Sequence, residues 1–304
     1  MRRHKAFTLI ELLVVISIIA LLLAILVPVL VKSREQGKGI VCLSNIRQLT
    51  IGWTMYAQTG DERLVNGAPI APGGPCPASM GCPPGTNCAA VAPATSVTNN
   101  AFRDFHINEP PWVGIAWGTT VGVPASEKCQ ICAIKTGALW GYVKQEKVYR
   151  CPTAPQGALV SYSIVDSMNG KYMYSGCSTA GYTPLPRKLC LKLLTHIKKP
   201  SERFVFLDEG FLSPDSFAVN YACPSWFDPP MMRHRNGTNA SFADGHSARL
   251  MWRADETIKA GQNITYSYTP KTCIGKNELY NIQIRTWGQI GYTPDPACSY
   301  KLIE

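Results

Sequence analysis

The sequence predicts an α+β protein shaped like a lollipop. A long N-terminal helix, half of it in a membrane, packs on an antiparallel β-sheet head that carries long disulfide-stapled loops. Three observations support this prediction. An uncharged apolar run covers residues 12–31, helical periodicity continues from there to about residue 60, and alternating segments follow, two of them joined by Asp244-Gly245. The 304 residues leave room for the helix and one large or two small folded units.

The N-terminal segment has the pattern of a membrane span. Residues 1–6 carry Arg2, Arg3 and Lys5, and the twenty residues 12–31 carry no charge. Twenty helical residues at about 1.5 Å each cover roughly 30 Å, the thickness of the hydrocarbon core of a bilayer. The basic end is expected to stay in the cytoplasm. The sequence therefore predicts a cytoplasmic leader peptide at residues 1–6 and a transmembrane helix over residues 7–31. This helix makes a single pass through the inner membrane, with the head in the periplasm or, after assembly, on the cell surface.

Glu11 lies at the start of this apolar run, where an acidic side chain is costly in lipid. A partner for the carboxylate would arise if the chain were cut between Ala6 and Phe7, because the cut creates an amino group four residues before Glu11. The carboxylate of one helix could then pair with the terminal ammonium of a neighbouring helix. Such a pair would neutralise both charges and set the axial register of a helical bundle.

The stretch Phe7-Thr-Leu-Ile-Glu11-Leu-Leu-Val-Val-Ile-Ser-Ile-Ile, after a basic leader and a small residue, resembles the prepilin signal shared by type IV pilins and type II secretion pseudopilins. The resemblance implies that a membrane peptidase cleaves between Ala6 and Phe7 and N-methylates Phe7. It also implies a type IV pilin-like fold. The acidic assembly residue of the family falls on Glu11 and its helix-weakening proline on Pro28. Ala6 departs from the pattern, because glycine is usual at that position.

Two other interpretations of the N-terminus remain open, a cleaved secretory signal peptide and a simple uncleaved anchor. A secretory signal has a shorter apolar core and an Ala-x-Ala-like cleavage site. No such site follows residue 31, and neither interpretation has a use for Glu11.

The outer half of the helix is predicted to be amphipathic over residues 32–60. Its apolar residues recur in steps of three and four and so share one face, the pattern of Ile40, Leu43, Ile46, Leu49, Trp53 and Tyr56. Glycines weaken helices, so we expect a bend near Gly37 and Gly39. Gly60-Asp61 is expected to end the element.

The remaining chain divides into three predicted regions. Residues 61–125 form a Pro-, Gly- and Cys-rich insertion that cannot bury enough apolar surface to fold alone. Residues 126–253 form a β-rich head, and residues 254–304 an aromatic, Cys-containing C-terminal extension. Expected elements are a short helix or turn at 135–145, strands at 147–151, 159–165 and 203–208, a hairpin over 239–252 around Asp244-Gly245, and a last strand at 282–287.

All twelve cysteines lie on the outward side of the predicted span. An even number of cysteines in an exported domain indicates a disulfide framework. The pair Cys129-x-x-Cys132 could instead be a redox pair or half of a zinc site. By analogy with the terminal loops of pilins, a bridge between Cys273 and Cys298 is expected.

A second resemblance rests on His234, nine residues and Asp244-Gly245, which is similar to the H-x9-D-G motif of prepilin-like proteins of planctomycete-type bacteria. The stretches Cys42-Leu-Ser-Asn-Ile-Arg-Gln-Leu and Tyr149-Arg-Cys-Pro resemble the same group. This resemblance implies a pseudopilin or minor-pilin role and supplies no catalytic mechanism.

The residue types of this motif also suit a metal ion. His234, Asp244 and His246, with Asp208 and Glu209, are of the kinds that hold zinc or another divalent cation. The alternative is purely structural, because Asp244 fits the hairpin turn and His234 can hydrogen-bond the hairpin. Apart from this possible structural cation, no cofactor is expected. The sequence contains no catalytic serine elbow, phosphate loop or His-Glu-x-x-His motif, so we do not expect an enzyme.

The function predicted from the sequence is that of a pilin or pseudopilin subunit in a type IV pilus-like or type II secretion filament. The expected partners are further copies or homologues bound through N-terminal helices, a prepilin peptidase, the inner-membrane assembly platform and membrane lipid. Nucleic acid is not expected, because the net charge of +10 is scattered and no arginine–aromatic module is present. The alternatives are an anchored, non-polymerising binding module for envelope glycans or a partner protein and, third, an anchored metal-dependent enzyme.

Overall fold

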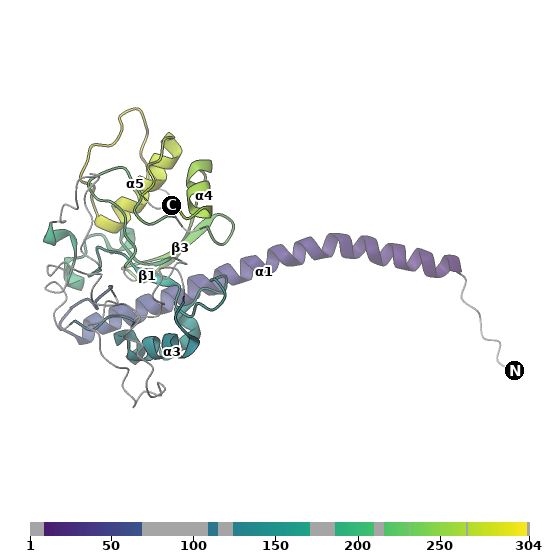
Figure 1. Cartoon of the computed structure of the whole chain (residues 1–304), viewed down its shortest axis with the longest axis horizontal. Helices are drawn as coiled ribbons and strands as arrows, with labels where there is room; N and C mark the ends of the chain where they lie inside the picture. Colours follow the sequence, from purple (N-terminus) through teal and green to yellow (C-terminus); the bar gives the residue numbers. More distant parts are fainter. Residues whose placement is uncertain are drawn as a thin grey trace.

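The computed structural model confirms the predicted lollipop, with one helix extending far from an α+β head (Figure 1). The structure describes residues 9–68, 109–114, 124–170, 186–209, 216–230, 232–265 and 267–302. Most of the predicted insertion at 61–125 lies outside these ranges. Two of its described parts, 61–68 and 109–114, belong to the head, where Leu64, Val65, Trp112 and Val113 are buried in the core.

Helix α1 (Leu9–Thr59) runs for 51 residues and is continuous through Pro28, Gly37 and Gly39. The weakening expected at the two glycines therefore leaves no break, and Figure 1 shows a gently curved rod. The helix ends as predicted, where Asp61 and Glu62 take φ angles of 53° and 62°. The amide of Glu62 donates to the carbonyl of Ala57 at 2.9 Å, which satisfies one of the last helical carbonyls.

The head is built on a four-stranded antiparallel sheet with the order β1 (Tyr162–Ile164), β2 (Phe204–Asp208), β3 (Gly237–Phe242) and β4 (Ser247–Met251). The predicted strand at 203–208 and the predicted hairpin are confirmed. Gly245 has a φ of 92°, the left-handed conformation that the Asp-Gly turn requires. The strand expected at 159–165 is shorter, because only three residues of β1 pair with β2.

The outer half of α1 lies across this sheet and supplies the centre of the core. Ile46, Leu49 and Trp53 are fully buried, as the helical spacing predicts, whereas Ile40 is 66% exposed. Polar contacts fix the helix on the sheet. Thr50 Oγ1 donates to Ser241 Oγ at 2.6 Å, and further bonds join the side chains of Asn239 and Ser247 to carbonyls of α1.

The strand predicted at 147–151 is wrong, because residues Glu146–Tyr149 form the 3-10 turn η4. The carbonyls of Lys147 and Arg150 accept hydrogen bonds from Asn45 Nδ2 on α1, at 3.4 and 3.0 Å, rather than from a neighbouring strand. The helix or turn expected at 135–145 is present in part as η3 (Ala138–Gly141). It follows α3 (Glu127–Thr136), which was not predicted.

The strand predicted at 282–287 is also wrong, because these residues end helix α5 (Cys273–Trp287). The alternation of apolar and polar residues there fits a strand when read alone. The ends of α5 carry the stronger signal. Thr272 caps its first turn by accepting from the amide of Gly275 at 3.1 Å, and Gly288 closes it with a φ of 76°.

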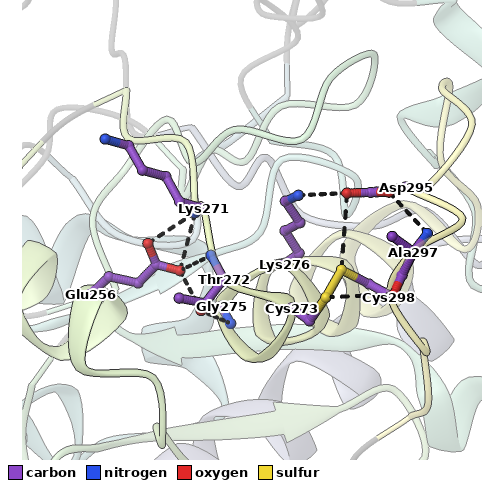
Figure 2. The surroundings of a disulfide bond; sticks show 9 residues. All are labelled: Glu256, Lys271, Thr272, Cys273, Gly275, Lys276, Asp295, Ala297 and Cys298. Carbon is purple, nitrogen blue, oxygen red and sulfur yellow. Dashed lines mark hydrogen bonds and ion pairs between the residues drawn. A yellow bond between two sulfur atoms is a disulfide. The ribbon is translucent and has the colours of Figure 1, made fainter.

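The remaining described elements are short. They are η5 (Arg187–Leu189), η6 (Leu194–His196), η7 (Pro200–Glu202) and α4 (Asp255–Gln262). The expected bridge between Cys273 and Cys298 is confirmed, with a Cα–Cα distance of 5.2 Å. Figure 2 shows the ion pair of Lys276 with Asp295 beside it, at 2.6 Å, so the C-terminal segment is fastened to α5 twice.

Candidate functional site

The first candidate site is the inner half of α1, which the head leaves bare. Every large apolar side chain from Leu9 to Val31 is 46–77% exposed. Among the described residues, α1 is the one helix long and apolar enough to cross a membrane, and none of its most apolar stretch is buried. An apolar surface of this size is unfavourable in water and indicates contact with lipid or with other helices.

The residues predicted for processing and assembly lie at or near the start of this helix. Ala6 and Phe7 fall outside the described residues. Glu11 is exposed in the first turn of α1, and Pro28 lies within the helix. The hydroxyl of Ser17 donates to the carbonyl of Val14 at 2.7 Å, so this polar group is satisfied within the helix and does not oppose burial in lipid.

The second candidate site is a buried cluster where α1 meets the sheet. Cys42 comes from α1, Cys151 follows η4, Asp208 ends β2, and His234 lies in the turn before β3. One potential ligand atom of each lies within 4.8 Å of the others. Cys42 Sγ is 3.5 Å from Asp208 Oδ2, which is 3.4 Å from His234 Nε2, and this nitrogen is 3.1 Å from Cys151 Sγ. Four distant parts of the chain therefore converge on one point.

The backbone that carries His234 is held in an uncommon conformation. The amides and carbonyls of Arg233 and Gly237 bond each other at 3.0 and 2.7 Å and close a tight loop. Inside it, His234, Arg235 and Asn236 have φ angles of 49°, 66° and 57°. Left-handed conformations are unfavourable for residues other than glycine and are concentrated at functional sites. The loop points the His234 ring inward, where its Nδ1 has no hydrogen-bond partner among the described residues.

The cluster is also electrostatically unusual. Burial raises the pKa of the Cys42 thiol, whereas hydrogen bonds from Cys42 and then His234 lower that of Cys151. Burial opposes the charged form of His234, but its bonds to Asp208 and Cys151 outweigh this and raise the pKa to about 9. Burial raises the pKa of Asp208 against the attraction of Arg233, whose Nη1 is 3.2 Å from Asp208 Oδ1. Ionisable groups are therefore concentrated where water is excluded.

The structure brings together only part of the metal set expected from the sequence. His234 and Asp208 share the buried cluster, whereas Asp244 and His246 pair at the exposed turn between β3 and β4. Asp244 Oδ1 accepts from the His246 amide at 3.1 Å, as a structural role in the turn predicts. Glu209 is hydrogen-bonded to Ser163.

Two members of the cluster, Cys42 and Cys151, do not belong to the metal set expected from the sequence. A cysteine is a possible zinc ligand by residue type, but nothing in the local sequence places either of these two beside His234.

The cysteines within the described ranges divide into two groups. Cys132, Cys223, Cys273 and Cys298 are disulfide-bonded, so the expected framework is confirmed in part. Free and buried thiols belong to Cys42, Cys129, Cys151 and Cys190. The redox or zinc interpretation of Cys129 and Cys132 is wrong in this structure, because Cys132 is oxidised and Cys129 is not its partner.

One comparison with known proteins gives a match. The family model of the prokaryotic N-terminal methylation motif matches residues 1–27. No match was found among curated proteins or among solved structures. The matched segment includes Ala6, Phe7 and Glu11 and runs into the bare half of α1. The chain therefore carries an N-terminal methylation motif on a long apolar helix and has the character of a pilin-like prepilin.

Proposed function

We propose that the chain is a structural subunit of a type IV pilus-like or type II secretion pseudopilus filament. The observation that carries this proposal is the combination of the methylation motif at residues 1–27 with the uncovered apolar half of α1. Before assembly, lipid covers this half. After assembly, the helices of neighbouring subunits cover it in the middle of the filament, with the heads outside.

The way in which α1 is held supports a mechanical role. Its outer half supplies the fully buried side chains Ile46, Leu49 and Trp53, so the helix cannot leave the head without opening the core. Its inner half makes no such contacts. A force applied to the assembled helices is therefore transmitted directly to the sheet of each subunit.

In this proposal, a prepilin peptidase cuts between Ala6 and Phe7 at the cytoplasmic side and methylates the new N-terminus. Glu11 then pairs with the terminal ammonium of Phe7 on an adjacent subunit. A carboxylate and an ammonium in lipid are each costly alone and far less so together. The pair thus favours assembly in one axial register.

The first test is mass spectrometry of the native protein from its own membranes. The N-terminal peptide is expected to begin with methylated Phe7. Replacement of Ala6 by a bulky residue should leave the leader in place, because the small side chain before the cut is part of the motif. Native protein that still carries residues 1–6 would contradict the proposal.

The second test compares Glu11→Ala with Glu35→Ala, the same change on the same helix outside the apolar run. Glu35 is half-exposed and pairs with Lys38, so its loss should have little effect. Glu11→Ala should insert normally in the membrane and fail to assemble into filaments or to cross-link with neighbouring subunits. Normal assembly of Glu11→Ala would favour an anchored module that does not polymerise.

A further inference from the structure

We propose that Cys42, Cys151, Asp208 and His234 bind a structural zinc ion that joins α1 to the sheet. The proposal concerns the head alone and does not depend on filament formation. It replaces the exposed Asp244 and His246 of the sequence-based hypothesis with two buried cysteines.

The geometry of the four ligand atoms fits zinc. Tetrahedral zinc with bonds of about 2.3 Å to sulfur and about 2.0–2.2 Å to nitrogen or oxygen places its ligand atoms roughly 3.3–3.8 Å from one another. Two of the observed separations, 3.5 and 3.4 Å, lie in this range, and the third, 3.1 Å between His234 Nε2 and Cys151 Sγ, has to widen by a few tenths of an ångström around an ion. All remaining pairs lie within 4.8 Å. Small shifts of the four side chains are therefore enough to surround an ion.

The charges of the site also balance with a divalent cation. Two thiolates and one carboxylate carry three negative charges, His234 is neutral as a ligand, and Arg233 adds one positive charge 3.2 Å from Asp208 Oδ1. One Zn²⁺ brings the sum to zero. Buried ions are tolerated when they are paired or coordinate a metal. The cation therefore explains why four ionisable ligand residues, each only 0–4% exposed, lie together in the core.

Groups outside the four ligands hold them in place. The Tyr162 hydroxyl donates to Cys42 Sγ at 3.3 Å, and Thr153 Oγ1 lies 3.0 Å from Cys151 Sγ. Arg233 contacts Oδ1 of Asp208, which leaves Oδ2 for the ion. Such outer partners orient metal ligands and tune their basicity. The strained turn at residues 234–236 has a function in this arrangement, because it delivers His234 Nε2 to the site.

The site is structural rather than catalytic. Four protein ligands complete the coordination of zinc, whereas catalytic zinc keeps one position open for water or substrate. The ligands come from α1, the segment after η4, the end of β2 and the turn before β3. An ion at this point therefore connects α1 to three separate parts of the head.

A disulfide between Cys42 and Cys151 is the chemical rival, since the two sulfurs are close and the head is proposed to be exported. It would consume both thiolates and leave Asp208 and His234 without an ion. The test must therefore measure metal and thiols on the same sample.

The full-length chain, purified in detergent without added chelator, should contain one zinc per chain by elemental mass spectrometry. Exchange for Co²⁺ should give the intense sulfur-to-cobalt absorption and the visible bands of tetrahedral cobalt thiolates. In the unmodified protein, Cys42 and Cys151 should resist alkylation until zinc is chelated. The reactivity of Cys190, which is buried outside the cluster, should not change with chelation.

Variants complete the test. Cys42→Ser, Cys151→Ser and His234→Ala should each lose the stoichiometric zinc, and Tyr162→Phe should weaken zinc affinity by about tenfold. Cys190→Ser is the matched control and should keep it. A Cys42–Cys151 disulfide in the native chain, another metal in place of zinc, or no bound metal would overturn the proposal. These three outcomes are read from the unmodified protein, so a variant that fails to fold cannot obscure them.

Discussion

Ile46 and Ile40 lie six residues apart on α1 in opposite surroundings. Ile46 is fully buried against the sheet, and Ile40 is 66% exposed. The same substitution at the two positions therefore separates burial from helix propensity. We expect Ile46→Ala to lower the free energy of unfolding of the head by about 2–5 kcal/mol, because the removed methyl groups leave a cavity.

The matched variant Ile40→Ala should change the free energy of unfolding by less than about 0.5 kcal/mol, since surface substitutions rarely do more. Denaturant unfolding of the detergent-solubilised chain, followed by tryptophan fluorescence, measures both. Equal losses at the two positions would contradict the packing of α1 on the sheet.

Glu256 gives the head a specific dependence on acid. Its carboxylate accepts bonds from the Thr272 hydroxyl and from the amides of Lys271 and Thr272, at 2.5–3.1 Å (Figure 2). Burial raises its pKa, but these bonds outweigh burial and lower it to about 2 from an ordinary 4.5. A carboxyl group whose pKa is lowered on folding stabilises the folded state fully at pH values above its ordinary pKa. This stabilisation is lost as the pH falls through the lowered pKa.

We therefore expect Glu256→Gln to lower the melting temperature at neutral pH and to have little further effect near pH 2. The difference in melting temperature between the unmodified protein and Glu256→Gln should shrink as the pH falls from 4.5 to 2. Thermal melts at several pH values measure it. A difference that stays constant with pH would show that the carboxylate charge is not what stabilises the contact between α4 and α5.

At the scale of elements, two glycines of α1 distinguish close packing from helix propensity. A Cβ on Gly52 would lie 2.5 Å from Val143 Cγ2, whereas nothing lies within 4 Å of a Cβ on Gly37. Gly52→Ala should lower the free energy of unfolding by about 1–3 kcal/mol, because the buried contact with Val143 would have to open. Gly37→Ala should be neutral or stabilise by up to about 1 kcal/mol, because alanine favours the helix.

Urea titrations of the two glycine variants give this comparison directly. A loss of stability in Gly37→Ala would mean that α1 needs a flexible point there, as the sequence alone suggested.

The elements that the sequence predicted correctly are those whose signals are local. The apolar run and the Asp244-Gly245 turn each determine their structure without help from distant residues. Segments 147–151 and 282–287 failed because the alternation that predicts a strand does not say whether a neighbouring strand exists. In segment 147–151, the hydrogen-bond partner is Asn45 on α1 and not a neighbouring strand. In segment 282–287, the caps at Thr272 and Gly288 favour a helix.

The buried cluster shows the same limit at the level of a site. His234 and Asp208 could be proposed from the sequence because histidine and aspartate are ligand types that suit a divalent cation. Cys42 joins them only through the packing of α1 across the sheet, and Cys151 through the turn of η4. Sequence spacing cannot reveal such a set, because its members are separated by dozens of residues and meet only in three dimensions.

At the scale of the whole molecule, the head and the bare half of α1 are energetically separate. Residues 9–31 bury none of their large apolar side chains against the head. The hydrogen bond from Arg235 Nη2 to the Lys32 carbonyl, at 3.2 Å, marks the place where the helix reaches the head. Removal of the chain before Lys32 should therefore leave the fold of the head intact and take away its affinity for lipid.

We expect a chain that starts at Lys32 to be a soluble monomer with the zinc content of the full-length protein. Its melting temperature should shift by less than about 2 °C, since roughly 2–4 °C corresponds to 1 kcal/mol in a domain of this size. Light scattering and calorimetry give the two readouts. A large drop in melting temperature would show that the apolar half supports the head. Heads that still polymerise would place the assembly contacts on the head itself, because the truncated chain lacks both Glu11 and the apolar surface that the filament model requires.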